Sequence, residues 1–295
     1  MSAQAKLECD RGHILLDGGR VGILLIHGLG GTPVELNFVA QALNRAGHTV
    51  YCPLLDGHGG PGERLNATTW MDWYKSVAQA HDVLKERSEV IIVGGLSAGV
   101  LLALHLAAER PLEVDGTLLY SPTFWPDGWA TPRCLGLLKL LPYKWLADLI
   151  SLQERAPYGI KDERIRAVVL NSQQSDGPSI KDFFGRKGGT VLELHRLAKT
   201  VAKELGSIKQ PTLIFHPRFD DQSDISNSVL LQSKLRGLTE LVVLNDCYHM
   251  VTLDRQRTDV ADRSVDFCAW VTRQHEQQRE MLRLKHTANR SIATL

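Results

Sequence analysis

The alternation of short apolar runs with longer helical patterns is the feature that most constrains how this chain can fold. The apolar runs lie at residues 21–26, 49–53, 90–93, 117–120, 212–215 and 241–244. Strands that alternate with helices form parallel sheets, because each helix carries the chain back across one face of the sheet. The sequence therefore predicts an α/β fold with a mostly parallel central sheet flanked by helices.

A glycine pair near the amino terminus modifies this pattern. Gly18 and Gly19 separate the apolar segment Ile14–Leu16 from the run at residues 21–26. Glycine readily adopts the positive φ angles that two-residue hairpin turns require. We therefore expect a hairpin between these two segments, with its first strand forming an antiparallel edge of the sheet.

A long interruption separates the first four apolar runs from the last two. Between Tyr120 and Pro211 the alternation stops for about 90 residues, far longer than an ordinary connection between a strand and a helix. A helical pattern closes this stretch: Thr190 and Glu193 have the spacing of a capping box, and Gly206 ends the pattern. We expect a core of residues 1–121 and 210–273, an inserted and mainly helical cap of residues 122–209, and a polar, solvated or frayed tail of residues 274–295.

Composition and charge argue against several classes of function. The formal net charge is +1, and acidic and basic residues are mixed along the chain. The sequence therefore offers no concentration of positive charge that would bind nucleic acid. No apolar run approaches the length of a membrane span, and the first residues lack the apolar core of a secretion signal. Five cysteines without paired spacing predict reduced thiols. We therefore expect a cytoplasmic protein without an integral membrane segment.

The sequence GLSAG at residues 95–99 places a serine directly after a predicted strand and before a helical pattern. A serine on such a tight turn needs small residues two positions to either side, and Gly95 and Gly99 meet this need. The turn exposes the serine hydroxyl at the end of the strand. Ser97 is therefore predicted to be a nucleophile.

A nucleophilic serine requires a base that takes its proton and an acid that orients the base. In an α/β sheet these residues belong in loops after the carboxyl ends of later strands. His249 follows the last apolar run, and Asp220 follows the run before it. Asp221 and Asp224 are alternatives for the acid, and they are also suited to capping the next helix.

Acyl transfer to a serine also requires two backbone N–H groups that stabilise the oxyanion. Ala98 offers one at the amino terminus of a predicted helix. Leu29 offers the other in a glycine-rich loop after the first apolar run. Thr32 as N-cap, Pro33 in the first turn and Glu35 as the capping-box partner are expected to start the helix that follows.

These segments resemble the α/β-hydrolases, and among them the small bacterial carboxylesterases and monoacylglycerol lipases. The resemblance rests on HGLGGTP at 27–33, DGHG at 56–59, GLSAG at 95–99, PRFDD at 217–221 and YHMVTLDRQ at 248–256. It implies the α/β-hydrolase fold and an activity that needs no cofactor. It also implies the following roles: Ser97 as nucleophile, His249 as base, Asp220 as triad acid, and Leu29 and Ala98 as oxyanion donors.

Two positions depart from the family pattern. Val100 stands where relatives often carry glycine, and a polar stretch follows Asp221 where relatives usually have an apolar pair. The second departure bears on the acid. The spacing to His249 in the family favours Asp220 over its alternatives.

Other candidate residues have both a structural and a functional interpretation. His27 and His58 are expected to stabilise their loops rather than to act in catalysis. No histidine or cysteine pair has the spacing of a zinc site, so we expect no metal. Leu29, Trp125 and Trp129 are candidates for binding an acyl group. The two tryptophans, like Phe124, Phe183 and Phe184, are equally suited to the core of the cap.

The predicted function is therefore hydrolysis of a small-molecule carboxylic ester through an acyl-enzyme on Ser97. An acyltransferase or a thioesterase would use the same three residues. A non-catalytic protein that binds ligands or partners through its cap would not need all of them.

Overall fold

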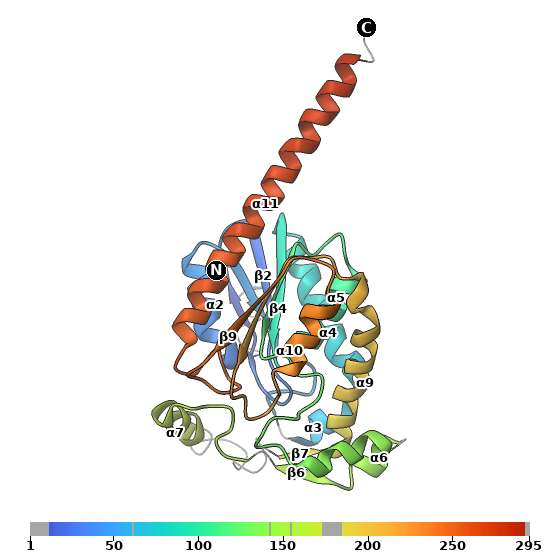
Figure 1. The fold of residues 1–295 in the computed structure, drawn as a ribbon, viewed down its shortest axis with the longest axis vertical. Coiled ribbons are helices and arrows are strands. Elements are labelled where there is room, and N and C mark those ends of the chain that lie inside the picture. Colours follow the sequence, from blue (N-terminus) through green and yellow to red (C-terminus); the bar gives the residue numbers. More distant parts are fainter. Residues whose placement is uncertain (1–11, 61, 142, 154, 173–184, 293–295) are drawn as a thin grey trace.

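The computed structural model describes residues 12–60, 62–141, 143–153, 155–172 and 185–292. Its centre is a sheet with helices on either side (Figure 1). The seven strands follow the order β1-β3-β2-β4-β5-β8-β9, and every neighbouring pair except β1 and β3 is parallel. The strands are β1 (Ile14–Leu16), β2 (Val21–Ile26), β3 (Thr49–Cys52), β4 (Val90–Leu96), β5 (Gly116–Tyr120), β8 (Thr212–Pro217) and β9 (Thr239–Leu244). The predicted α/β architecture is confirmed.

Helices cover both faces of this sheet. Those of the core are α2 (Asn37–Arg45), α3 (Gly62–Ala67), α4 (Trp70–Lys85), α5 (Ala98–Glu109), α10 (Ser226–Lys234) and α11 (Arg257–Ile292). Alternate residues of β2 point to opposite faces: Leu24 packs with α4 and α5, whereas Ile23 packs with α2 and α11. Burial on both faces explains why the central strands are apolar runs rather than alternating patterns.

The antiparallel edge strand is present, but the expected hairpin is wrong. β1 pairs with β3, with Ile14 opposite Cys52, rather than with β2. Both edges of β2 are already occupied by β3 and β4. Gly18 instead packs against the turn before β3. Its N–H donates to Thr49 Oγ1, and an added Cβ would lie 2.3 Å from the carbonyl oxygen of His48.

The segment between β5 and β8 contains short elements and one long helix. They are η2 (Arg133–Leu140), α6 (Lys144–Ala147), β6 (Ser151–Gln153), α7 (Glu163–Ser172), β7 (Gly185–Lys187) and α9 (Gly188–Glu204). β6 and β7 pair as a small antiparallel sheet beside the helices. The start of α9 packs in an apolar cluster with η2 and α6, whereas its later residues, including Leu197 and Val201, pack with α5.

The predicted capping box of α9 is wrong. The helix begins at Gly188 with Lys187 as N-cap, so Thr190 and Glu193 already lie inside it. Thr190 Oγ1 donates to the side chain of Asn66, and Glu193 accepts a hydrogen bond from the backbone N–H of Trp70 and pairs with Arg196. Both side chains bind partners across the fold instead of capping their own helix.

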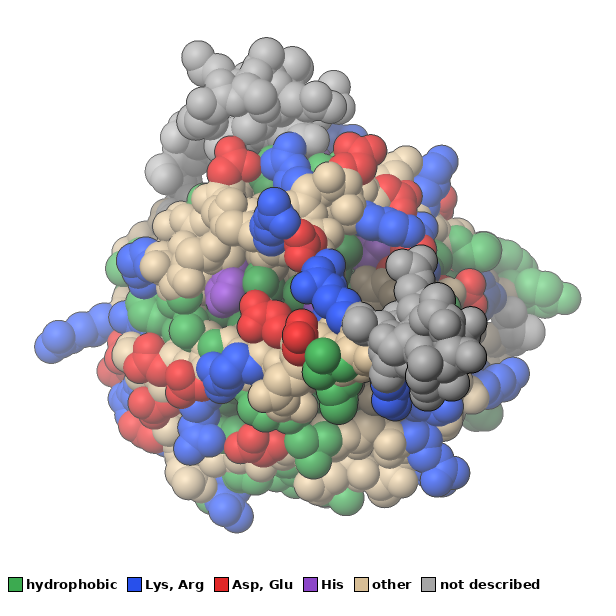
Figure 2. Space-filling model, turned by 90° about the horizontal axis from the view of Figure 1, so that it is seen from above, with side chains coloured by type: hydrophobic (Ala, Val, Ile, Leu, Met, Phe, Trp, Pro, Cys, Tyr) green, Lys and Arg blue, Asp and Glu red, His purple; other side chains and the backbone are tan. Residues whose placement is uncertain are grey.

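The polar tail continues α11 as far as Ile292, and this helix extends away from the body of the protein (Figure 1). Residues 276–285 are exposed, so the segment is solvated as expected but helical rather than frayed. Seen along this direction, Lys and Arg side chains are interspersed with Asp and Glu (Figure 2). Among the described helices, none combines the length and apolar character needed to span a bilayer.

Candidate active site

Ser97 lies on a sharp turn between β4 and α5. Its φ of 56° and ψ of −115° place it in the left-handed half of the backbone map, where residues with a Cβ are strained. A Cβ on Gly95 would lie 2.4 Å from the carbonyl carbon of Gly99, and one on Gly99 would lie 2.2 Å from the oxygen of Ile26. Both glycines are therefore required by close backbone contacts, as the spacing around the serine predicts.

Two hydroxyl residues after β5 connect this turn to the histidine loop. The Ser97 hydroxyl donates to Thr123 Oγ1 at 3.2 Å, and Thr123 Oγ1 donates to the carbonyl oxygen of Ser121. Ser121 Oγ in turn donates to the carbonyl oxygen of His249 at 2.6 Å. Sequence reasoning missed Ser121 and Thr123, although their position after β5, the strand next to β4, places them at the same sheet edge as Ser97.

His249 and Asp220 form a buried pair. His249 Nδ1 lies 2.8 Å from Asp220 Oδ2 and 3.0 Å from Oδ1, and the two residues are 1% and 5% exposed. Because an aspartate accepts and does not donate, Nδ1 carries the proton and Nε2 is left as the basic nitrogen. Asp220 Oδ1 also accepts the backbone N–H groups of Gln222 and Ser223, which fix the carboxylate plane.

The two alternative acids, Asp221 and Asp224, have hydrogen-bond partners other than the His249 ring. Asp224 accepts the N–H of Ser226 at the start of α10, which is a capping role. Asp221 is fully buried and accepts the backbone N–H of Gly159 at 2.8 Å and that of His249 at 3.3 Å. Burial raises the pKa of Asp221 above its usual value. Of the three aspartates, Asp220 is the one whose carboxylate contacts the imidazole.

A second buried histidine supports the loop that carries Asp220. His216 Nε2 donates to the carbonyl oxygen of Ser223, and its Nδ1 accepts the hydroxyl of Ser228 at 2.7 Å. A ring that donates through one nitrogen and accepts through the other is neutral, and burial lowers the pKa of His216 in the same sense. This residue was not singled out from the sequence, since its partners lie 7 and 12 positions away.

The glycine-rich loop after β2 approaches the serine closely. A Cβ on Gly28 would lie 3.6 Å from Ser97 Cβ. His27 Nδ1 donates to the carbonyl oxygen of Gly28, and its Nε2 accepts the N–H of Leu55, so the neutral ring braces the loop as predicted. Burial lowers the pKa of His27 well below its ordinary value. His58 Nδ1 likewise lies 3.0 Å from the carbonyl oxygen of Asp56 within its own loop.

The predicted capping box at the end of this loop is wrong. Thr32 is the N-cap and Pro33 starts the turn, but the Thr32 side chain makes no capping hydrogen bond. The Glu35 carboxylate instead accepts the N–H of Gly28 at 3.2 Å. It lies so close to Gly31 that a Cβ there would be 2.0 Å from it. Glu35 therefore fixes the loop that presents Leu29.

A cavity of about 550 Å³ opens over Ser97 between the core and the inserted segment. Its described lining consists of Leu29, Ser97, Thr123, Pro126, Ala130, Thr131, Pro132, Leu135, Ser151, Leu152, Gln153, Arg155, Val191, Leu194, Asp221 and Gln222. Leu29 thus lines the same space as Ser97. Ala98 is the first residue of α5 and directly follows Ser97.

The two candidate tryptophans lie outside this lining. Trp125 is 9% exposed and packs in the apolar cluster of η2, α6 and α9, with its ring edge-on to His195 at 5.1 Å. Trp129 is 59% exposed and donates its indole N–H to the carbonyl oxygen of Phe219. Phe124 packs in the core cluster with α5. Phe183 and Phe184 lie outside the described residues.

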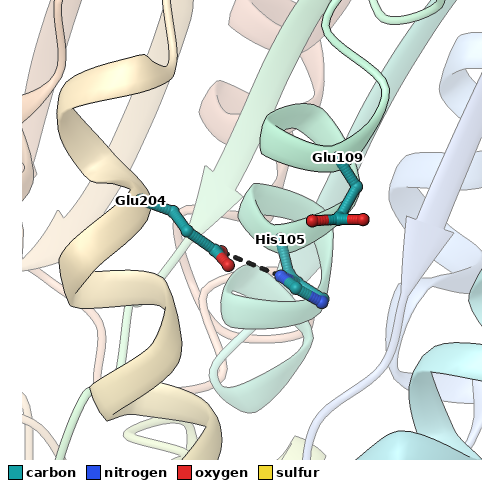
Figure 3. Close-up of side chains that lie close together, drawn as sticks. All are labelled: His105, Glu109 and Glu204. Carbon is teal, nitrogen blue, oxygen red and sulfur yellow. Dashed lines mark hydrogen bonds and ion pairs between the residues drawn. The ribbon is translucent and has the colours of Figure 1, made fainter.

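One group of side chains in the described ranges has the composition of a metal site. His105 and Glu109 on α5 and Glu204 on α9 have ligand atoms within 4.8 Å of one another (Figure 3). In this structure His105 Nδ1 pairs with Glu204 at 2.8 Å, and its ring packs against Trp70 and Tyr74. None of these residues is among the described lining of the cavity.

Comparisons with known proteins show which family the chain belongs to. Residues 20–256 match the family described as serine aminopeptidase, S33. The chain is 31% identical over 258 residues to a thermostable monoacylglycerol lipase of a Bacillus species, a match that covers 86% of this chain and 92% of that protein. It is 24% identical over 254 residues to a carboxylesterase of Bacillus subtilis, with 81% and 89% covered.

A solved structure shows the same fold. The crystal structure of Paleococcus ferrophilus monoacylglycerol lipase matches this structure with a TM-score of 0.73 and 21% identity, over 88% of this chain and 98% of that chain. This likeness concerns the fold, and the family match covers most of the sequence. The chain therefore belongs to the serine aminopeptidase family of α/β-hydrolases.

Proposed function

We propose that Ser97, His249 and Asp220 form a catalytic triad that hydrolyses carboxylic esters. The observation that carries the proposal is the buried pair of His249 and Asp220, which hydrogen bonds through Ser121 and Thr123 connect to a cavity-lining serine on a strained turn. Perturbed backbone geometry and a buried, oriented imidazole are the features expected of an activated serine. The names of the relatives, monoacylglycerol lipase and carboxylesterase, support an ester as the substrate.

The mechanism assigns one step to each group. The Ser97 hydroxyl turns from Thr123 toward His249 Nε2, which takes its proton as the oxygen attacks the ester carbonyl. The backbone N–H groups of Leu29 and Ala98 stabilise the oxyanion, and His249 then returns the proton to the leaving alcohol. Asp220 holds Nδ1–H throughout. Water repeats the sequence on the acyl-enzyme and releases the carboxylic acid.

The volume of the cavity supports a small-molecule substrate. A volume of about 550 Å³ lies within the range of roughly 300–1,000 Å³ that is usual for small-molecule sites. Leu135, Leu152 and Val191 from the inserted segment contribute apolar lining, which supports a cap role for the described residues of this segment. Polar lining such as Gln153 and Gln222 suits the alcohol side of an ester.

We place the protein in a reducing, cytoplasmic compartment. Cys52, Cys247 and Cys268 are free and buried. Free thiols are the usual state of cysteines in that compartment.

The direct test of the proposal is hydrolysis of short aryl esters by the full-length protein and by Ser97→Ala. The wild-type protein is expected to hydrolyse them, and the variant is expected to lose several orders of magnitude in kcat/KM because nucleophilic attack is removed. A series of esters with increasing acyl length then defines the preferred substrate. Full activity of Ser97→Ala would refute the assignment.

A further inference from the structure

A short piece of the cap lies directly against the histidine loop. We call residues 158–162 the strap. The carbonyl oxygen of Gly159 accepts the N–H of Met250 at 2.8 Å. Gly159 has a φ of 75°, and a Cβ there would lie 2.8 Å from Met250 Cγ and 3.2 Å from His249 Cβ. The strap can approach His249 this closely only because it has glycine at this position.

A buried carboxylate fastens the far end of the strap to the same loop. Asp254 is fully buried and accepts the N–H groups of Lys161 at 2.8 Å and Asp162 at 2.9 Å. Its Oδ2 also accepts the N–H of Tyr248, the residue before His249. On the surface, Lys161 Nζ pairs with Asp246 at 2.7 Å. The strap is therefore attached on both sides of His249.

Asp221 makes the corresponding attachment next to the imidazole. One carboxylate oxygen accepts the N–H of Gly159 and the other accepts the N–H of His249. The carbonyl oxygen of Asp221 also accepts the N–H of Ala130, which belongs to another part of the cap. The residue therefore joins the acid loop, the histidine loop and two cap segments through three backbone donors.

The free-energy cost of leaving buried polar groups unpaired makes the strap and the histidine loop move together. Asp221 is 0% exposed although it borders the cavity, so water has little access to a carboxylate oxygen that loses its partner. Separation of the strap from His249 would leave a buried carboxylate oxygen or a buried N–H without a partner, which is costly. A carboxylate with no donor of its own suits this position, because the groups that face it are N–H donors.

We propose that Asp221 is a positioning residue that couples the seating of the cap to the placement of His249 against Ser97. This inference rests on the proposed function, since it concerns the base of that triad. When the strap is seated, His249 is held where its Nε2 can receive the serine proton. When the strap lifts, the backbone of His249 shifts with it, and small displacements of a catalytic group lower the rate strongly.

The test compares Asp221→Asn with Asp224→Asn in the full-length protein. Asparagine at 221 keeps the size of the side chain but turns an amide N–H₂ toward a backbone N–H donor. Asp224→Asn changes an aspartate of the same loop whose carboxylate faces Ser226. The assays are kcat and KM for a short aryl ester, the rate of labelling by a fluorophosphonate, and the midpoint of thermal unfolding.

We expect Asp221→Asn to lower kcat and the labelling rate in parallel, by roughly 10-fold to 100-fold, with KM unchanged. Asp224→Asn should behave like the wild type. A raised KM with an unchanged labelling rate would mean that Asp221 contacts substrate instead, and would overturn the inference. An unchanged kcat in folded Asp221→Asn protein would overturn it as well.

A second variant decides the matter if Asp221→Asn does not fold. Lys161→Met keeps the aliphatic stem of a partly exposed side chain but removes the ion pair between the strap and Asp246. The inference expects a severalfold lower kcat with unchanged KM, and wild-type kcat would contradict it. Failure of the proposed function itself is distinct, because the wild-type protein would then neither hydrolyse the ester nor react with the fluorophosphonate.

Discussion

Replacing Asp220 with asparagine tests how the acid orients the base. Asp220 Oδ1 accepts the N–H groups of Gln222 at 2.8 Å and Ser223 at 2.9 Å, so in the variant the amide oxygen is held at that position. The amide N–H₂ then occupies the position of Oδ2, which lies 2.8 Å from His249 Nδ1. A donor at that position forces Nδ1 to accept, and the ring proton moves to Nε2. The imidazole can then no longer take the proton of Ser97.

The size of the effect follows from this change of tautomer. In serine triads the wrong tautomer lowers kcat by roughly 10⁴-fold. That factor corresponds to about 5 kcal/mol of transition-state stabilisation, because each tenfold change in rate is about 1.4 kcal/mol. The ring remains packed and the acid loop keeps both of its backbone hydrogen bonds, so the loss should appear in kcat with little change in KM.

The assay is steady-state hydrolysis of a short aryl ester by wild-type protein, Asp220→Asn and the control Asp224→Asn. Circular dichroism and thermal unfolding show whether each variant is folded. Folded Asp220→Asn protein that kept more than about a tenth of the wild-type kcat would refute the role given to the carboxylate. An equal loss in Asp224→Asn would show that the acid had been assigned to the wrong residue.

Two further predictions concern stability. Burial lowers the pKa values of His27 and His216 below the ordinary 6.5, so below about pH 6.5 the unfolded chain binds protons that the folded protein does not. The free energy of unfolding, measured with urea between about pH 5 and pH 7.5, should therefore be constant above about pH 6.5 and fall below it, by up to about 1.4 kcal/mol per pH unit for each of these two histidines; a flat profile down to about pH 5 would contradict this. Gly99→Ala should destabilise the protein by about 1–3 kcal/mol or more and abolish ester hydrolysis, because its Cβ would meet backbone atoms that cannot move aside. Gly206→Ala, whose Cβ would meet nothing within 4 Å, is the matched control in the same urea titrations, and equal stability of the two variants would refute the steric argument.

Features that depend on local chemistry could be predicted from the sequence. The apolar runs became the strands of the parallel sheet, because a strand buried on both faces is apolar throughout. The helix after Ser97 begins at Ala98, as predicted. His27 stabilises its loop because both nitrogens of the buried ring form hydrogen bonds with backbone groups.

Features that depend on partners distant in sequence could not be predicted. Glu35 and Glu193 have the spacing of capping boxes, but Glu35 binds Gly28 and Glu193 binds Trp70, which are closer in the fold. The edge strand β1 pairs with β3 because β3 and β4 already occupy both sides of β2. Trp125 packs in the apolar cluster of η2, α6 and α9 rather than lining the cavity. The presence of aromatic residues in a segment does not indicate which way each side chain points.

The role of Asp221 was also hidden from the sequence. Its neighbour Asp220 has the same side chain, and the two differ only in which groups the fold brings to them. Gly159 lies 62 positions away and His249 lies 28 positions away. The polar stretch after Asp221 was visible as a departure from the family pattern. The hydrogen bonds of Asp221 to Gly159 and Ala130 became apparent only from the structure.

The central claim is that Ser97 is the nucleophile, and covalent mapping tests it most directly. The folded protein is treated with a fluorophosphonate, digested, and analysed by mass spectrometry alongside Ser97→Ala. We expect one adduct per chain, located on the peptide that contains Ser97, with ester hydrolysis lost in proportion and no adduct in the variant. An unmodified Ser97 in protein that hydrolyses esters, or an adduct that persists in Ser97→Ala with activity, would contradict it.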